Sequence, residues 1–185
     1  SEGPLPRQAA PVGGDWVQLP GPEGVAAVAL RRASAVVPAP VDPTTVVHPV
    51  RLSLPLPGAA TPIWSLSNGL LRAELGPEGL RQIWGADGRP QLASSLEWRR
   101  WRDHGEFWDA WDIAADYRDH PLSLHWQPTP QLAEQGPLCT RLVWRGRCGA
   151  SDLRLDVQLQ AASPWLELSL SVRWRQRHEL LRLEI

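Results

Sequence analysis

Two long runs of alternating apolar and polar residues lie in the last third of the chain. Between Leu153 and Gln160 every second residue is leucine or valine, and the residues between them are charged or polar. The run from Leu166 to Trp174 repeats the pattern. Alternation of this length is typical of a half-buried β-strand. Two such neighbours with polar outer faces predict an antiparallel pair, with Trp174 on the buried face.

Shorter strands separated by turn residues are predicted from residue 63 onward. Asn68-Gly69 leads into residues 70–75, and Gly76-Pro77-Glu78-Gly79 leads into residues 80–84. These are the turn residues of β-hairpins. Asp87-Gly88 supplies a further turn before a strand expected around residues 96–101. No segment of comparable length carries a helical stripe, so the predicted fold class is an all-β, antiparallel β-sandwich.

The chain changes in texture near residue 63. Residues 1–62 are rich in proline, alanine, valine and glycine, and proline pairs separate short apolar runs at 25–30 and 50–54. We expect residues 1–62 to form a Pro-rich segment of short β-strands that precedes a main sandwich at 63–185. The chain begins without methionine and stops at Ile185 inside an alternating run. We therefore expect it to be a segment of a larger protein whose N-terminal part is missing.

The composition argues against nucleic acid and membrane as partners, and the two cysteines indicate a compartment. All 19 basic residues are arginine and 20 residues are acidic, so the net charge of −1 argues against nucleic acid as a partner. No apolar run approaches the ~18 residues that span a bilayer, so no membrane partner is expected. On one extended strand Cys139 and Cys148 would lie roughly 30 Å apart, beyond disulfide reach. Two buried thiols suit a reducing compartment, which predicts a cytoplasmic location.

Chemistry-bearing residues are densest between Asp103 and His120. Asp109 and Asp112 would suit a retaining glycosidase if their carboxyl groups lay about 5 to 5.5 Å apart, which requires a helical turn. In a strand they would lie about 10 Å apart on opposite faces. The alternative interpretation is that both carboxylates cap turns or bind backbone amides, and that reading is favoured.

A metal site is also conceivable from the histidines and aspartates of this segment. The candidate ligands are His104, Asp109, Asp112, Asp116 and His120. Their spacing matches no common ligand pattern, so solvated loop residues are the favoured interpretation.

Tryptophan dominates the aromatic residues, with eleven among thirteen. An indole face can cover the C–H face of a sugar while a neighbouring carboxylate binds its hydroxyl groups. Most of these side chains should be core, but Trp108 and Trp111 stand among acidic residues and are candidates for exposure. The mixtures of arginine and tryptophan at 99–102 and 173–177 resemble the composition of proteins that bind single-stranded nucleic acid. In a strand, however, the arginines face solvent, and His178 is expected to be structural.

Five segments, taken in order, resemble the C-terminal part of the family-38 glycoside hydrolases, the α-mannosidases, and most closely the branch with cytosolic and bacterial enzymes. The segments are 66–71, 79–80, 107–113, 134–138 and 178–182. Trp-Asp-Ala-Trp-Asp at 108–112 is the strongest piece, and the resemblance covers residues 63–185. Phe107 stands where tyrosine is frequent, and Arg182 where lysine is usual.

The resemblance implies a galactose-mutarotase-like β-sandwich, or supersandwich, that follows an N-terminal α/β catalytic domain and a helical bundle. In the family, the aspartate nucleophile and the ligands of a catalytic zinc ion lie in those earlier domains. No catalytic residue, metal ligand or cofactor is therefore assigned to this fragment, and zinc is implied only for the missing catalytic domain. The parent reaction is hydrolysis of terminal α-mannosides with retention.

Three hypotheses follow. In the first, the chain is the non-catalytic β portion of an α-mannosidase and is inactive alone; its partners are its own catalytic domain and an α-mannoside or oligosaccharide substrate. Trp108, Asp109, Trp111 and Asp112 would then bind substrate or form the domain interface. The second hypothesis is a stand-alone carbohydrate-binding module, and the third a structural sandwich that mediates oligomer contacts.

Overall fold

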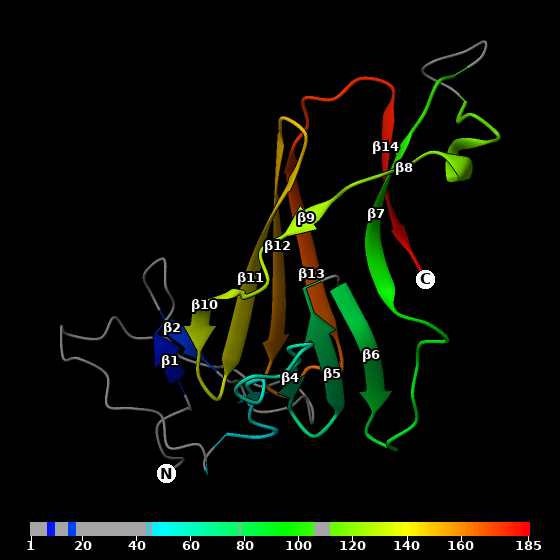
Figure 1. Cartoon of the computed structure of the whole chain (residues 1–185). Coiled ribbons are helices and arrows are strands. Elements are labelled where there is room, and N and C mark those ends of the chain that lie inside the picture. Colours follow the sequence, from blue (N-terminus) through cyan, green and yellow to red (C-terminus); the bar gives the residue numbers. More distant parts are fainter. Residues whose placement is uncertain (1–6, 10–14, 18–43, 45, 78, 106–111) are drawn as a thin grey trace, which may run out of the picture.

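Two antiparallel β-sheets face each other across one apolar core in the computed structural model of the chain (Figure 1). The structure describes residues 7–9, 15–17, 44, 46–77, 79–105 and 112–185. Within these residues there is no α-helix, and the 3₁₀ turn η2 (Tyr117–Asp119) lies between β7 and β8. The predicted fold class, an all-β antiparallel sandwich, is confirmed. The described residues contain no helix that is long and apolar enough to cross a membrane.

The smaller of the two facing sheets has five strands and is built around the alternating runs. Its strands are β9 (His125–Trp126), β10 (Gln131–Gln135), β11 (Cys139–Cys148), β12 (Ser151–Gln160) and β13 (Leu166–Arg173). They follow the order β10-β11-β12-β13, with β9 also paired to β11. Strand β12 pairs antiparallel with β13, from Leu159 opposite Leu166 to Asp152 opposite Arg173. This confirms the predicted pair.

The larger sheet has seven strands that come from both ends of the described sequence. Its strands are β3 (Arg51–Ser53), β4 (Trp64–Ser67), β5 (Leu71–Gly76), β6 (Gly79–Gly85), β7 (Leu96–Arg102), β8 (Pro121–Leu122) and β14 (Glu179–Glu184). The order is β14-β7-β6-β5-β4-β3, with β8 also on β7. The predicted hairpin through Asn68-Gly69 is confirmed as β4–β5. The late strand β14 lies antiparallel to β7, from Glu179 opposite Arg102 to Glu184 opposite Glu97.

Residues before 63 contribute two further features. The short strand expected near residues 50–54 is β3, and it pairs with β4 at the edge of the seven-stranded sheet. Strands β1 (Arg7–Ala9) and β2 (Asp15–Val17) form a separate two-stranded sheet. The apolar run at 25–30 lies outside the described residues.

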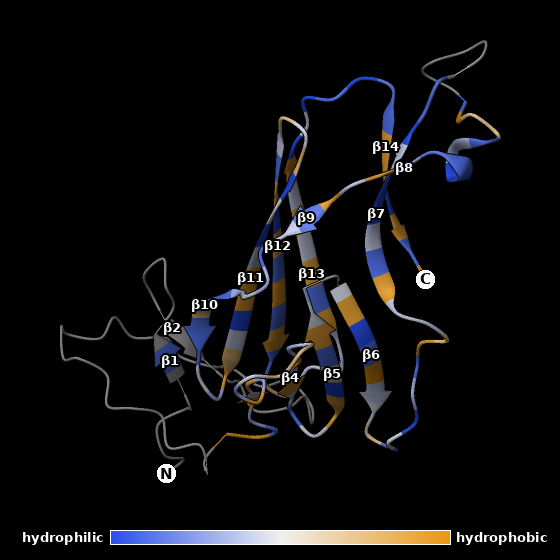
Figure 2. Ribbon diagram, in the orientation of Figure 1, coloured by the Kyte–Doolittle hydropathy of each residue, from blue (hydrophilic) through white to orange (hydrophobic). Residues whose placement is uncertain are grey.

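The core forms where the apolar faces of the two larger sheets meet. Leucine and valine alternate with polar residues along the strands, as the orange and blue bands of Figure 2 show. Tryptophan side chains complete this core. Leu66 of one sheet and Val157 of the other are fully buried. Trp64 packs edge-on against Trp144, with ring centroids 5.6 Å apart, and so joins the two sheets. Burial of such side chains stabilises the fold by about 1.5 to 3 kcal/mol each.

A buried asparagine fastens the two sheets together at one end. Asn68, which is 2% exposed, donates from Nδ2 to the carbonyl oxygens of Gln160 (2.8 Å) and Ser163 (2.7 Å). Its Oδ1 accepts from the backbone amides of Leu70 (3.1 Å) and Leu71 (3.0 Å). The amide therefore closes the β4–β5 turn and also holds the β12–β13 turn of the opposite sheet.

Strand β9 lies against β11 through a tryptophan and a glycine. Trp126 is opposite Gly146 in the strand register. A β-carbon on Gly146 would lie 2.6 Å from Cε3 of the Trp126 ring, so the indole occupies the space of a side chain at position 146.

The prediction that Trp174 points into the core is wrong. Strand β13 ends at Arg173, and Trp174 is 38% exposed. The reason is that the β12–β13 pairing ends at Asp152 opposite Arg173, and only Ser151, the first residue of β12, lies beyond that pair. The chain then leaves the sheet, and the Arg175 amide donates to Ser151 Oγ instead (2.8 Å).

Candidate functional site

The candidate site lies in the connection between β7 and β8, residues 103–120. Three of the residues singled out by sequence, Trp108, Asp109 and Trp111, lie outside the described residues. Asp112 is exposed, and its Oδ1 accepts a hydrogen bond from the Ile113 amide at 2.9 Å. The separation between the Asp109 and Asp112 carboxyl groups therefore stays a prediction.

The described flanks of this connection are tied to each other and to the sheet. Asp103 Oδ1 accepts from the Ala114 amide at 2.9 Å. The Arg102 amide donates to the His120 carbonyl oxygen, also at 2.9 Å. Both bonds bring the departing and returning chain together at the end of β7. A third hydrogen bond, from the Asp103 amide to the His178 carbonyl oxygen (2.8 Å), attaches the connection to the residue before β14.

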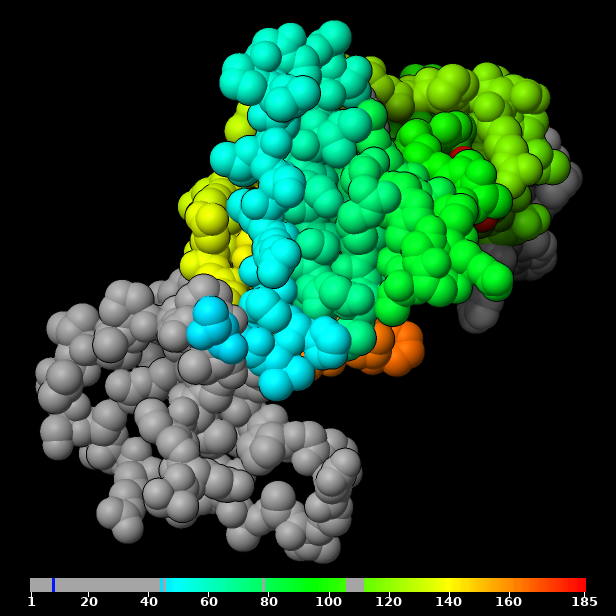
Figure 3. Space-filling view, turned by 90° about the horizontal axis from the view of Figure 1, so that it is seen from below, coloured from blue at the N-terminus to red at the C-terminus, as the bar shows by residue number. Residues whose placement is uncertain are grey.

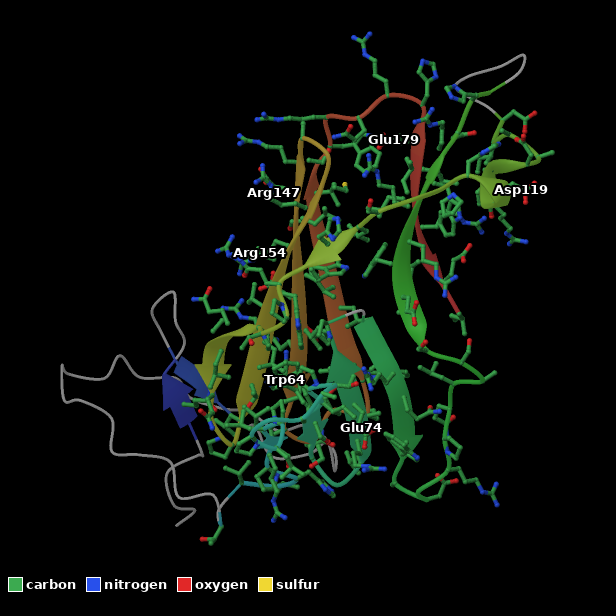
Figure 4. The ribbon with its side chains drawn as sticks, viewed as in Figure 1. Trp64, Glu74, Asp119, Arg147, Arg154 and Glu179 are labelled. Atoms are coloured by element: carbon green, nitrogen blue, oxygen red, sulfur yellow. The ribbon has the colours of Figure 1, made fainter. Side chains whose placement is uncertain are left out.

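A sheltered ion pair joins β7 to β14 beside the same connection. Arg100 donates from Nε to Glu179 Oε2 and from Nη2 to Oε1, each at 2.7 Å. The side chains are only 10% and 16% exposed. Arg100 Nη1 also donates to the Ser123 carbonyl oxygen just after β8 (2.9 Å). Bidentate pairs of this kind combine strength with fixed geometry. Figure 4 shows Glu179 at the start of β14, and Asp119 in the η2 turn farther out.

Tyr117 is the centre of a second contact between the connection and β14. It is 8% exposed and packs edge-on against Trp101, with ring centroids 5.5 Å apart. Its phenol oxygen accepts from Arg118 Nε at 3.0 Å and from Arg182 Nη1 on β14. The two guanidinium groups also lie 5.5 and 5.3 Å from the ring centroid. One tyrosine therefore fastens η2 to both β7 and β14.

Sequence reasoning did not single out Tyr117 or Glu179 for a role. The signal for Tyr117 is that it is the only tyrosine in the chain, placed among charged residues where a phenol can accept hydrogen bonds. Arg182 stands where lysine is usual, and its guanidinium group donates to the phenol oxygen of Tyr117. Residues 178–182 and the 103–120 connection, far apart in sequence, thus meet at one end of the larger sheet.

The candidate metal ligands are not gathered into one site where they are described. His120 Nε2 lies 3.3 Å from Asp116 Oδ2, whereas the His104 ring lies against His178 with centroids 5.6 Å apart. No three histidine, cysteine or acidic residues of the described part are grouped to hold a metal ion. Asp109 lies outside the described residues, so the complete five-residue set has no described geometry. The described residues do not fit a zinc site.

A hollow of about 430 Å³ adjoins the Tyr117 contact. It is lined by Trp98, Arg99, Arg100, Trp101, Arg118, Pro121, Leu122 and Leu124. Aromatic and apolar surface with a few charged groups is typical of sugar sites and of contacts between domains. No acidic side chain lines this hollow, so its lining offers no acid-base pair of the kind that glycoside hydrolysis needs. The lining of this hollow can position and bind a ligand or a neighbouring domain.

Comparison with known proteins agrees with this picture. The Glycosyl hydrolases family 38 C-terminal domain matches residues 66–185. The chain is also 27% identical over 186 residues to human Alpha-mannosidase 2C1. That similarity covers 90% of this chain but only 17% of the human protein, so the chain spans a small part of its relative's length. Because the family match covers well over half of the residues, the chain belongs to the family 38 glycosyl hydrolases, as part of their C-terminal domain.

Proposed function

We propose that this chain is the non-catalytic β-sandwich portion of an α-mannosidase. The parent protein hydrolyses terminal α-mannosides with retention, and this portion supports the catalytic domain. The 103–120 connection contributes to the sugar cleft or to the interface with that domain, through Trp108, Asp109, Trp111 and Asp112. The chain alone is inactive.

The observation that carries the proposed parent is the family match over residues 66–185. The attachment of the connection to β14 supports its proposed role as a contact surface. The Arg182–Tyr117 contact ties η2 to β14, and the Asp103 amide donates to the carbonyl oxygen of His178, the residue before β14. The Arg100–Glu179 pair joins β14 to β7, the strand from which the connection leaves. A segment with a fixed base suits a binding surface, because binding groups on rigid supports lose less entropy on contact.

The catalytic domain is the proposed partner, and it is where we place zinc and the nucleophile. The described residues offer no set of three metal ligands, so no step of the reaction is assigned to them. An α-mannoside or oligosaccharide is the proposed substrate of the parent, and neither nucleic acid nor membrane is a proposed partner. A cytoplasmic location is supported by two buried free thiols, which a reducing compartment preserves.

The proposal is tested by assaying the 185-residue chain beside the full-length protein that contains it, with an aryl α-mannoside as substrate. We expect turnover only in the full-length protein, and the α anomer of mannose should be the first product seen by proton NMR. Turnover by the chain alone, or release of the β anomer first, would contradict the proposal.

A fluorescence titration of the chain with mannose and mannobiose tests the alternative, a stand-alone carbohydrate-binding module. The proposed role predicts no saturable change in tryptophan emission, since the catalytic domain supplies most of the sugar contacts. Saturable binding by the isolated chain would favour the module instead.

A further inference from the structure

We propose that the outer face of the seven-stranded sheet carries a binding site for a small phosphate-bearing molecule, in a hollow far along the sheet from β14. The hollow has a volume of about 520 Å³, within the range of small-molecule sites. Its lining includes His48, Arg51, Ser67, Arg72 and Trp84. We call these five residues the arginine hollow.

The strand register places four of these residues in one row. Arg51 on β3 is opposite Ser67 on β4, and Ser67 is opposite Arg72 on β5. Arg72 is in turn opposite Trp84 on β6. Residues directly opposite one another on adjacent strands point to the same face of a sheet. Neighbouring strands are about 4.8 Å apart, so the bases of the two arginines lie roughly 10 Å apart with a hydroxyl group between them.

The row lies on the outside of the sandwich. The adjacent row one residue along contains Leu66 and Ala73, which are both fully buried in the core. Because successive side chains alternate in direction, the Arg51–Trp84 row faces away from the core. Figure 3 shows the segment that contains β3, in cyan, at the surface beside β4 to β6.

One of the two arginines is already held in place. The Arg72 guanidinium carbon lies 3.8 Å from the centroid of the Trp84 ring, and Nη1 lies 3.1 Å from Glu74 Oε1. Stacking on an indole leaves the edge of a guanidinium group free to bind an oxyanion. Glu74 balances part of this charge, but it does not line the hollow.

Three other polar side chains of the hollow are unpaired within the described part of the chain. The Arg51 guanidinium, the Ser67 hydroxyl and the His48 ring have no hydrogen-bond or ionic partner among those residues. His48 also has a positive φ of 51°, a conformation that costs free energy in a residue other than glycine. Its carbonyl oxygen accepts from the Ala162 amide at 3.3 Å, which holds the residue at the rim.

These groups match the chemistry of a phosphate monoester. Arginine binds phosphate through paired N–H donors, and the serine hydroxyl and the histidine ring can donate to the remaining oxygens. No acidic side chain lines the hollow, so the local charge is positive although the whole chain carries −1. The site is too small for a nucleic acid surface, and a single phosphate group on a small molecule is the ligand it fits.

Isothermal titration calorimetry with inorganic phosphate, glucose 6-phosphate and glucose, at one ionic strength, tests this site. Both phosphate compounds should bind saturably, and glucose should not. Arg51→Gln should weaken binding about tenfold or more, since it removes charge-assisted hydrogen bonds. The matched control is Arg173→Gln. Arg173 is an exposed arginine on the other sheet, and its side chain also has no hydrogen-bond or ionic partner among the described residues. The control variant should change binding less than about twofold.

Arg51→Gln should not disturb the fold, because the Arg51 side chain is exposed and makes no described polar contact. The melting temperature of this variant should equal that of the wild type. The proposal is overturned by absence of saturable phosphate binding, by equal binding of glucose and glucose 6-phosphate, or by equal losses in the two variants. None of these readouts uses mannosidase activity, so failure here leaves the proposed function intact, and failure there leaves this site intact.

Discussion

The side chain of Gln8 pairs with the backbone of Cys139 as a neighbouring strand would. Gln8 Nε2 donates to the Cys139 carbonyl oxygen at 2.8 Å, and Oε1 accepts from the Cys139 amide at 3.0 Å. The Gln8 side chain makes two further hydrogen bonds: its Oε1 accepts from the Leu138 amide (2.9 Å), and its Nε2 donates to the Glu134 carboxylate (3.0 Å). Gln8 is 8% exposed. One side chain thus joins the two-stranded sheet to the start of β11.

This contact depends on Gly136, and the two residues should prove coupled. A β-carbon at position 136 would lie 2.1 Å from Gln8 Oε1, so Gly136→Ala must displace the amide. We expect Gln8→Ala and Gly136→Ala each to lower the free energy of unfolding by about 1 to 3 kcal/mol. The double variant should lose clearly less than the sum, because both changes remove the same bonds. Urea denaturation of all four proteins checks this, and additive losses would refute the coupling.

Asn68→Ala should be among the most destabilising single changes on the sheet. It leaves the carbonyl oxygens of Gln160 and Ser163 and two backbone amides without their partner in a buried turn. The free energy of unfolding should fall by about 2 to 4 kcal/mol. Gln91→Ala is the control, since that exposed side chain donates only to the carbonyl oxygen of Arg89. It should cost less than about 0.5 kcal/mol, and similar losses in both variants would contradict the role of Asn68.

Neither cysteine should react while the protein is folded. Burial, helped by the Glu134 carboxylate, raises the pKa of the Cys139 thiol to about 12. Burial also raises the pKa of Cys148. Only the thiolate reacts with disulfide reagents. At pH 8 we therefore expect no labelling by a disulfide reagent in buffer, and two labelled thiols per chain in urea. Labelling of either cysteine in the folded protein would contradict this.

Asp156 should contribute a pH-dependent part of the stability. Arg154 donates to its two oxygens at 2.6 and 2.8 Å and lowers the pKa of the Asp156 carboxyl group. A carboxyl group whose pKa is lowered by folding stabilises the protein above its unfolded pKa, here 3.8, and loses that contribution as pH falls through the folded value. The stability difference between wild type and Asp156→Asn should be full at pH 7 and shrink below pH ~4. A difference that stays constant down to pH ~2.5 would count against it.

Tyr117→Phe should loosen the 103–120 connection more than the sandwich. The change removes the oxygen that accepts from Arg118 and Arg182, while the ring can still pack on Trp101. We expect global stability to fall by only about 1 kcal/mol, because both guanidinium groups can be hydrated. Hydrogen exchange should become faster in residues 113–120 and unchanged in β12. Arg177→Gln, an exposed residue of the β13–β14 connection, should leave exchange in 113–120 unaltered.

Local pattern was sufficient for the long alternating strands, but it did not reveal the short strands β8, β9 and β10 or which strands distant in sequence pair with each other. The alternation at 153–160 predicted β12 and its pairing with β13, because one face of each strand is buried and consecutive strands are joined by a short turn. The alternation predicted the wrong burial for Trp174, because the pattern of one strand cannot show where its pairing with the next strand ends. The pairing of β14 with β7 is a long-range contact that leaves no local signature.

The candidate site was predicted less completely than the fold. Composition located the 103–120 segment, and Trp108, Asp109 and Trp111 remain predictions outside the described residues. The contact between Tyr117 and Arg182 joins residues far apart in sequence, so no spacing rule could reveal it. The resemblance of residues 178–182 to the family pointed to that segment, and the contacts of Glu179 and Arg182 give a physical reason for it.

The indole of Trp126 over Gly146 has a consequence for how this sheet can evolve. Strand β11 has no side chain at Gly146, and the indole of Trp126 on the paired strand β9 fills that space. A larger residue at 146 collides with the ring, and a smaller one at 126 leaves a void, so neither position can drift alone. We therefore expect a substitution at one of the two positions to be tolerated only together with a compensating change at the other.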